Sequence, residues 1–278
     1  SAKAKFFDDY LETLTQITPI EDIEYIIVDH TEPDHAGSVE KLLEINPTIK
    51  VVGSATAITF LQHIVNRDFY SVVVDDGDTL SLGDKTIRFY SVPSLHWPDT
   101  IYSYIEEDGV LVTCDSFGSH YAHDGILRST VTDYEGYMRA TKYYFDNILG
   151  PFKQPHMANA LKLVREELKP VMICPGHGPV LDSGLEDLYE KYEEWCGQPA
   201  ENQPKKVVIP YVSAYGYTAQ LAEKIAEGVR SAGDFEVKLY DMVTASKDEV
   251  LGEIAGADGI LFGTPTRSEE RRVGKECR

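Results

Sequence analysis

The 278-residue chain carries a formal net charge of −20 and has a pI near 4.7. Its length suggests about two domains. The acidic balance argues against nucleic acid and anionic membranes as partners, because contact with phosphates needs a basic surface. The four cysteines show no CxxC spacing that would indicate a zinc site or a disulfide framework. No apolar run approaches the length of a membrane span, so we expect a globular, cytoplasmic protein.

The chain begins with the pattern of an amphipathic helix, whose apolar side chains recur at helical spacing. These side chains are Phe6, Phe7, Tyr10, Leu11 and Leu14. Two strand-then-helix units are expected next. They are strand 25–28 with a helix over 38–45, and strand 50–53 with a helix over 56–65.

A cluster of metal-ligand residue types follows the first strand directly. His30, Glu32, Asp34 and His35 fall within six residues, on a loop that the end of a rigid strand would hold in place. His30 and Glu32 can point one way while Asp34 and His35 follow on the turn, which suits two neighbouring metal ions better than one. The alternative is a polar loop that only caps a helix starting near Ala36.

Further ligand types stand at the ends of later strands: His96, Asp115, and His177 between Gly176 and Gly178. The two glycines would allow close backbone approach around His177. Strand ends that meet at one sheet edge would bring these residues to the His30 loop, so we interpret the whole set as a metal site. The strands expected in this part of the chain cover residues 70–74, 79–82, 86–92, 101–105, 110–114 and 171–174.

Two questions remain open around this site. The first concerns the aromatic residues of the segment 133–148. Either the hydroxyl of Tyr143 or Tyr144 donates a hydrogen bond into the metal pocket, or these aromatic side chains only form part of the hydrophobic core. His120 and His123, in the loop after Asp115, are either ordinary loop residues or partners of the metal ligands. Helices are expected over residues 133–148, 154–168 and 185–195.

A second α/β pattern follows the segment 197–204, which has the composition of an interdomain linker. Strand 206–212 leads into a loop of small and hydroxyl-bearing residues and then a helix over 219–232. Free backbone amides and the helix dipole at such a turn would bind an anion. Strand 237–240, helix 247–254 and strand 259–262 come next. The candidate cofactor-binding residues are Ser213, Tyr215, Gly216, Tyr217 and Thr218, and then Thr264, Pro265 and Thr266.

The HxExDH pattern of residues 30–35, with His96, Asp115 and the Gly-His-Gly at 176–178, resembles the metallo-β-lactamase fold as flavodiiron proteins carry it. Hydrolases of this fold resemble HxHxDH and hold zinc, whereas Glu32 matches the carboxylate of the flavodiiron pattern. The loop after residue 212 resembles the FMN phosphate loop of flavodoxins. The resemblance implies a metallo-β-lactamase-like αββα sandwich followed by a partial flavodoxin-like doubly wound parallel sheet.

The resemblance also implies two non-haem iron ions and FMN as cofactors. One iron would be held by His30, Glu32 and His96 and the other by Asp34, His35 and His177, with Asp115 bridging. Whether His35 is a ligand stays open, because some family members leave the matching histidine off the metal. Ser213 to Thr218 would hold the FMN phosphate, and Thr264 to Thr266 would contribute to the rest of the pocket.

The family reduces O2 to water, NO to N2O, or both, and the sequence does not separate these substrates. Electrons pass through FMN from a donor such as rubredoxin or a reductase, within a head-to-tail homodimer. The alternative function is a zinc-dependent hydrolase of the same fold, similar to thioesterases and glyoxalase II. Glu32 and the flavin-type loop oppose that alternative.

The expected domains are a diiron domain over residues 1–196, a linker over 197–204 and a partial FMN domain over 205–266. Residues 267–278 break the pattern, and a codon choice for their start spells a common sequencing adapter. We interpret them as non-native read-through and exclude them. We expect truncation at both ends, because the family carries strands before the first helix and five strands in its flavodoxin fold. Since this chain supplies only three of those five strands, we expect its FMN site to be incomplete.

Overall fold

The computed structural model describes residues 2–197 and 205–265. By its internal contacts the chain divides into two units, Ser1–Pro199 and Ala200–Arg278, and each is treated by itself below. Most of the expected linker, together with Thr266 and the segment 267–278, lies outside the described residues. None of the helices in the described ranges combines the length and the hydropathy that a bilayer crossing requires.

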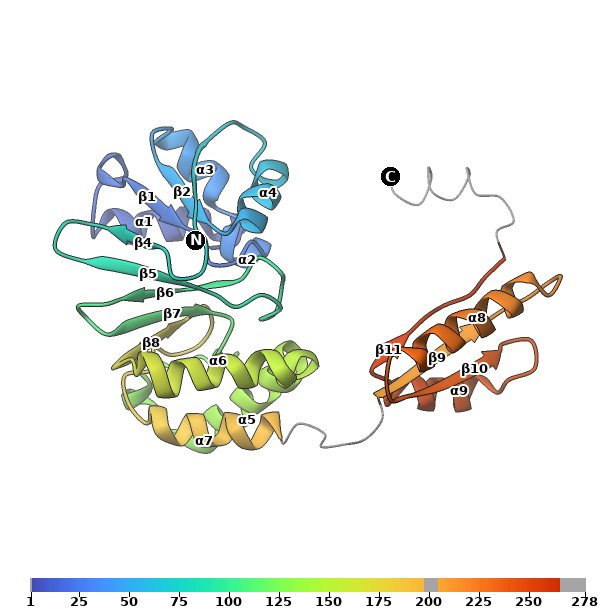
Figure 1. The fold of residues 1–278 in the computed structure, drawn as a ribbon. Coiled ribbons are helices and arrows are strands. Elements are labelled where there is room, and N and C mark those ends of the chain that lie inside the picture. The colour runs from blue at the N-terminus through green and yellow to red at the C-terminus, as the bar shows by residue number, and fades with distance from the viewer. Residues whose placement is uncertain (1, 198–204, 266–278) are drawn as a thin grey trace. The chain divides into compact units, whose positions relative to one another are not determined.

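The first unit consists of two sheets packed face to face between two layers of helices (Figure 1). The first sheet has the order β1-β2-β3 and is parallel throughout. Its elements and helices are β1 (Tyr25–Ile27), β2 (Lys50–Gly53), β3 (Tyr70–Val73), α1 (Phe7–Thr15), α2 (Pro33–Ala36), α3 (Val39–Ile45) and α4 (Ala55–Ile64).

Apolar spacing explains how these first helices cover the sheet. Phe7 of α1 packs against Leu42 of α3, as the amphipathic pattern of the opening segment predicts. Val39 and Leu61, from α3 and α4, meet Val51 of β2 in a second cluster. The side chain of Ser54 caps α4 by accepting from the backbone amide of Ala57 at 3.1 Å. The buried layer fixes where β1 ends, and β1 precedes the ligand-rich loop.

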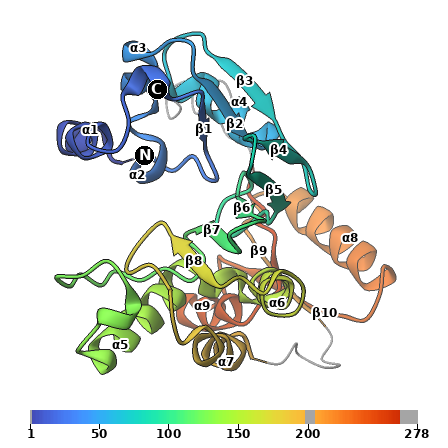
Figure 2. The same ribbon diagram turned by 90° about the vertical axis from the view of Figure 1, so that its left-hand side faces the viewer.

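The second sheet has the order β4-β5-β6-β7-β8 and is antiparallel except for the final pair, β7 and β8. Val52 and Val74 pack against Ile87, Phe89 and Ile101 between the two sheets. Helices α5, α6 and α7 cover the outer face (Figure 2). The elements are β4 (Thr79–Ser81), β5 (Thr86–Ser91), β6 (Ile101–Ile105), β7 (Val110–Cys114), β8 (Met172–Pro175), α5 (Tyr134–Tyr144), α6 (Ala158–Lys162) and α7 (Leu185–Cys196).

Two expected helices are less regular than their sequence pattern suggests. The helix expected over 133–148 is α-helical only to Tyr144 and continues as the π-helical turn Phe145–Leu149. The helix expected over 154–168 holds α6 between two π-helical turns, and Gln154 has non-helical backbone angles. Burial of Phe145, Leu149 and Met157 in one cluster shows that tertiary packing decides the geometry here.

The second unit is a three-stranded parallel sheet of order β10-β9-β11. This is the strand order 2-1-3 by which a flavodoxin-type sheet begins. Val207 and Ile209 of the central strand pack against Ala222 and Ala226 of α8. The elements are β9 (Lys205–Tyr211), α8 (Tyr217–Ser231), β10 (Phe235–Asp241), α9 (Lys247–Ala255) and β11 (Gly259–Ile260), which is shorter than the expected strand 259–262.

Candidate metal centre

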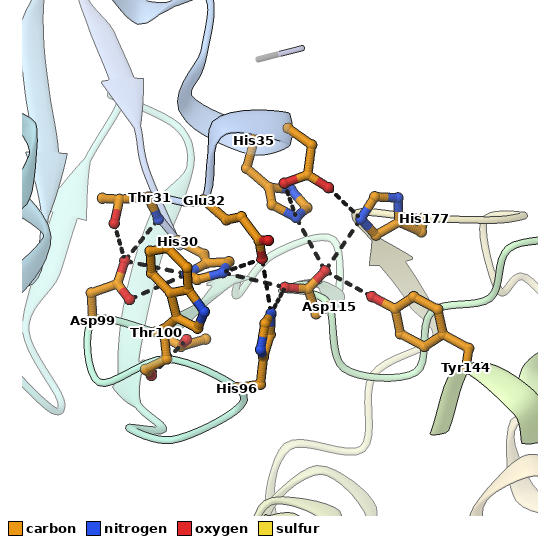
Figure 3. A network of polar contacts seen from close by, with 12 residues as sticks. His30, Thr31, Glu32, His35, His96, Asp99, Thr100, Asp115, Tyr144 and His177 are labelled. Atoms are coloured by element: carbon orange, nitrogen blue, oxygen red, sulfur yellow. Dashed lines mark hydrogen bonds and ion pairs between the residues drawn. The ribbon is translucent and has the colours of Figure 1, made fainter. Parts of the chain in front are cut away.

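The loop after β1 and the first turn of α2 supply four of the expected ligands. His30 is 1% exposed and Glu32 stands before Pro33, the first residue of α2. Proline suits this position because its missing N–H has no partner at the start of a helix. Asp34 and His35 therefore lie in a helical turn and not in a loop. The rigid turn places the ring of His35 beside that of His30, with centroids 5.4 Å apart (Figure 3). The Asp34 carboxylate contacts His35 and His177.

The other three ligands reach the same place from the second sheet. His96 lies in the loop between β5 and β6, Asp115 directly follows β7, and His177 follows β8. Figure 3 shows all three side chains directed toward the His30 loop. The structure thus brings together the whole ligand set predicted from the sequence, with ligand atoms within 4.8 Å of one another in each of two groups.

The first group contains His30, Glu32, His96 and Asp115. Oε2 of Glu32 lies 3.4 Å from Nε2 of His30 and 3.0 Å from Nε2 of His96. The second group contains Asp34, His35 and His177. Nε2 of His177 lies 3.2 Å from Oδ2 of Asp34, and Nε2 of His35 lies 3.7 Å from Oδ1 of Asp34. Each group therefore combines imidazole nitrogens with a carboxylate.

Asp115 lies between the two groups and offers one oxygen to each. Its Oδ2 is 3.5 Å from Nε2 of His30 and 3.4 Å from Nε2 of His96. Its Oδ1 is 3.1 Å from Nε2 of His35 and 3.3 Å from Nε2 of His177. Burial would raise the pKa of this carboxyl, but the surrounding imidazoles outweigh burial and hold the pKa well below its usual range. Asp115 is thus a buried carboxylate with the geometry of a bridge.

Two buried oxygens of this site test whether a cation fits. Oδ2 of Asp115 and Oδ1 of Asp34 accept no hydrogen bond from the described residues. A buried carboxylate oxygen without a donor is costly. Cations at the two groups would satisfy both oxygens, and the mixture of imidazole and carboxylate suits iron. The donor set therefore fits a pair of metal ions.

Asp99 is a buried carboxylate of this site that no sequence pattern singled out. It is fully buried, and its carboxylate accepts from Nδ1 of His30 at 3.2 Å. Its Oδ2 also accepts from the backbone amide of Thr31 at 2.7 Å and from the Thr31 hydroxyl at 2.8 Å. Burial opposes the charge of Asp99, but the bonds from His30 and Thr31 lower its pKa. Because Nδ1 of His30 carries the proton, its Nε2 is left free to ligate.

Replacing Asp99 with asparagine is expected to weaken metal binding about 10- to 100-fold, the usual cost of losing the carboxylate partner of a ligating histidine. The variant loses the charge that holds His30 in its ligating tautomer but keeps the shape. Competition with a chelator measures the affinity. Asp146→Asn, on the exposed surface of the same unit, is the control. Equal affinity in wild type and Asp99→Asn would contradict this role.

The structure decides between the two tyrosines. The Tyr144 hydroxyl donates to Oδ1 of Asp115 at 2.8 Å, whereas Tyr143 is 67% exposed. The Cys114 thiol, which cysteine spacing did not single out, lies within 4.8 Å of ligand atoms of His35 and Asp115. Burial raises the pKa of this thiol well above its ordinary value. Cys114 is therefore a neutral neighbour of the site, and Tyr144 is a hydrogen-bond donor to it.

Metal affinity is expected to fall as the pH falls through the raised pKa values of His96 and His177. The nearby carboxylate of Asp115 raises the pKa of both histidines above the ordinary histidine value, so protons compete with the metal for Nε2. Affinity should change by about tenfold per pH unit for each proton released. Metal titrations between roughly pH 5.5 and 8, a range that brackets the ordinary histidine pKa, measure this slope, and a flat profile would contradict it.

The folding stability of the metal-free protein is expected to change with pH in the opposite direction to the metal affinity. A histidine whose pKa is raised on folding stabilises the fold fully below its unfolded pKa, and this stabilisation is lost as the pH rises through the folded value. Asp29, whose pKa burial raises to about 7, titrates in the same window but donates no ligand atom to either group. Its hydrogen bond comes from the Ser103 hydroxyl at 2.7 Å.

The candidate cofactor loop of the second unit has the geometry of an anion site. Gly216 adopts a left-handed conformation with φ +84° immediately before α8. The Ser213 hydroxyl accepts from the backbone amide of Ala219 at 3.2 Å and so ties the loop to the helix. Tyr215, Tyr217 and Thr218 line a hollow of about 800 Å³; Ala214, Leu221, Phe262, Gly263, Thr264 and Pro265 complete its lining. The hollow thus contains most of the expected cofactor residues.

Each of the two units resembles a known protein family. Residues 2–178 match the model of the ODP family of β-lactamase-like domains, and residues 209–272 match the flavodoxin model. Flavo-diiron protein FprA2 of Clostridium acetobutylicum is 33% identical over 96% of this chain and 67% of that protein. Diflavin flavoprotein A 1 of Synechocystis is 34% identical over 95% of this chain. The chain spans 45% of the Synechocystis protein, under half of its length.

Solved structures give the same result. Rubredoxin oxygen:oxidoreductase of Desulfovibrio gigas has a TM-score of 0.67 and 30% identity, covering 96% of this chain and 66% of that one. The expected fold, a metallo-β-lactamase-like domain followed by a flavodoxin-like parallel sheet, is confirmed. The chain belongs to the flavodiiron proteins, a family that carries a non-haem diiron site in the first domain and FMN in the second.

Proposed function

We propose that this protein is an oxidoreductase that reduces O2 to water, NO to N2O, or both, at a non-haem diiron site supplied with electrons through FMN. One observation carries the proposal. Asp115 presents its two oxygens to two separate ligand groups, on a chain that also has a flavodoxin-like domain. A bridged pair of redox metals that receives electrons from a flavin is suited to multi-electron reduction of a small gas.

In this proposal His30, Glu32 and His96 hold one iron, Asp34, His35 and His177 hold the other, and Asp115 bridges them. The short distances between these ligand atoms and the two unsatisfied oxygens support the assignment. When bound, the iron pair would supply the redox chemistry of the reaction.

The protein's own groups position that pair. Asp99 keeps the proton on Nδ1 of His30, and the Tyr144 hydroxyl holds Oδ1 of Asp115. His30 and Asp115 are almost fully buried, whereas Glu32 is 35% exposed in its side chain. Glu32 is therefore the most exposed of the seven ligand side chains, and the bridging carboxylate is shielded from water.

FMN would occupy the hollow of the second domain, where it supplies electron transfer. We assign Ser213, Tyr215, Gly216, Tyr217 and Thr218 to its phosphate, with Thr264 and Pro265 in the rest of the pocket. The left-handed turn at Gly216 and the free amides at the start of α8 support this assignment. Thr266, the remaining candidate, lies outside the described residues.

The partners and the organisation of the protein are also proposals. An electron donor such as rubredoxin or a reductase delivers the electrons, and a head-to-tail homodimer brings each flavin to the diiron site of the other chain. The Desulfovibrio gigas relative carries rubredoxin in its own name, which supports a donor of this kind. We place the protein in the cytoplasm, with its diiron domain over residues 1–196, its linker over 197–204 and its FMN domain over 205–266.

The competing function is a zinc-dependent hydrolase of the same fold. Such an enzyme uses a Lewis-acidic metal to generate hydroxide and needs no electron supply. The carboxylate of Glu32, 3.0 Å from His96, adds anionic charge where the hydrolase pattern has an imidazole. That charge favours iron in its higher oxidation states, so the hydrolase is the weaker alternative.

Metal analysis together with the visible absorption of the purified protein tests the proposal. The expected result is two iron ions per chain, with the absorption bands of an oxidised flavin from the FMN that the partial domain binds. Purification with zinc and without flavin would favour the hydrolase. Reconstitution with Fe²⁺ and FMN under anoxic conditions then provides the sample for turnover measurements.

A further inference from the structure

His120 is a polar aromatic side chain beside the metal centre that belongs to neither ligand group. Its ring lies edge-on to Tyr144, with centroids 4.8 Å apart and planes at 89°. It also lies edge-on to His177, at 5.2 Å and 81°. Tyr144 and His177 are themselves 5.8 Å apart. The three rings form a triangle, and two of them donate to or approach Oδ1 of Asp115.

The backbone of the segment before His120 is fixed against the same two residues. At Gly118 an added Cβ would come within 3.3 Å of both the His177 carbonyl oxygen and Cε1 of Tyr144. The amide of Ser119 donates to the His177 carbonyl at 3.1 Å. A Cβ at Gly178 would collide with the Ser119 hydroxyl. The backbone position of His120 is therefore set by the loop that carries His177.

His177 lies between Gly176 and Gly178, so no side chain next to it in sequence restrains its ring. The orientation of the ring therefore depends on side chains that pack against it from elsewhere in the fold. The His177 ring packs against His35 at 5.0 Å and against His120. Without the His120 side chain, the His177 ring would keep its ring contacts with His35 and Tyr144. The imidazole of His177 would then be freer to turn away from Asp34.

We propose that His120 is a positioning residue, which holds the His177 imidazole and the Tyr144 ring in the orientation that the second ligand group requires. This role rests on the metal assignment of the proposed function. It depends on the shape and packing of the ring and not on a charge or a hydrogen bond. A flat apolar ring should therefore replace the histidine, and a small side chain should not.

The test uses Co²⁺ as the probe, under anoxic conditions, with chelator competition and visible d–d absorption as readouts. His120→Ala is expected to bind one of the two ions about tenfold more weakly and to change the absorption of that ion only. His120→Phe should restore binding to within about threefold of wild type. His63→Ala, an exposed histidine on α4, is the matched control, and circular dichroism checks that each variant folds.

Three results would overturn the inference. They are unchanged binding in His120→Ala, equal weakening of both ions, and failure of His120→Phe to restore binding. The proposed function is tested separately by turnover. Uptake of two ions without reduction of O2 or NO would refute the proposed function and leave the role of His120 intact. Normal turnover together with unchanged metal binding in His120→Ala would refute the role of His120 and leave the proposed function intact.

Discussion

Changing Asp115 to asparagine is expected to lower the affinity of the protein for a metal pair by more than about 100-fold. This loss of affinity is larger than the loss expected when one ligand loses its hydrogen-bond partner. Asp115 is 2% exposed, and its two oxygens face different ligand groups. Asparagine has nearly the same shape but lacks the charge and one acceptor oxygen. Under the proposed function, consumption of whichever gas the protein reduces should fall with metal occupancy.

Iron content and anoxic metal titration measure this loss directly. Asp146→Asn serves as the matched control, because Asp146 lies on the exposed surface and pairs with Lys142. Circular dichroism separates loss of metal from loss of fold. Full occupancy by two iron ions in Asp115→Asn would refute the bridging role, whatever the effect on turnover.

Changing Glu32 to histidine is expected to shift metal preference from iron toward zinc and to lower reductase activity by at least about tenfold. Oε2 of Glu32 lies near Nε2 of both His30 and His96. An imidazole there would remove a negative charge and complete the ligand set of the zinc hydrolases. Loading with equal concentrations of Fe²⁺ and Zn²⁺ gives the preference.

Glu32→Gln distinguishes the two effects of this substitution. It removes the charge without adding an imidazole, so iron binding should weaken and zinc binding should not improve. Unchanged iron preference and unchanged turnover in Glu32→His would contradict the importance of this carboxylate. The preference for iron would then have to come from the other ligands of the site.

Local patterns predict the fold well wherever a strand or helix is regular. The βα units around β1 and β2 follow from buried runs and apolar spacing, because local preference and tertiary burial agree there. They disagree around Phe145 and Gln154, where π-helical turns replace regular α-helix. Strand β11 ends at Ile260, two residues before the expected end, since pairing with β9 and not β-propensity sets its length.

The site is predictable where ligand types cluster and less so where support comes from distant residues. His30 to His35 are recognisable by their spacing. Asp99 is not, because its role depends on the backbone bringing it to His30, 69 residues away in sequence. Tyr143 and Tyr144 are adjacent, and only helix orientation shows which one reaches Asp115. Cys114 likewise enters the site through the position of β7.

The most direct measurement of the central claim is gas consumption by the protein loaded with iron and FMN, supplied with a competent reductant. O2 and NO are followed by electrodes in separate runs, and a zinc-loaded sample is offered a thioester in parallel. Reduction of at least one gas is expected, dependent on iron, FMN and reductant together, without thioester hydrolysis. Consumption of neither gas, with turnover of the thioester by the zinc form, would contradict the central claim.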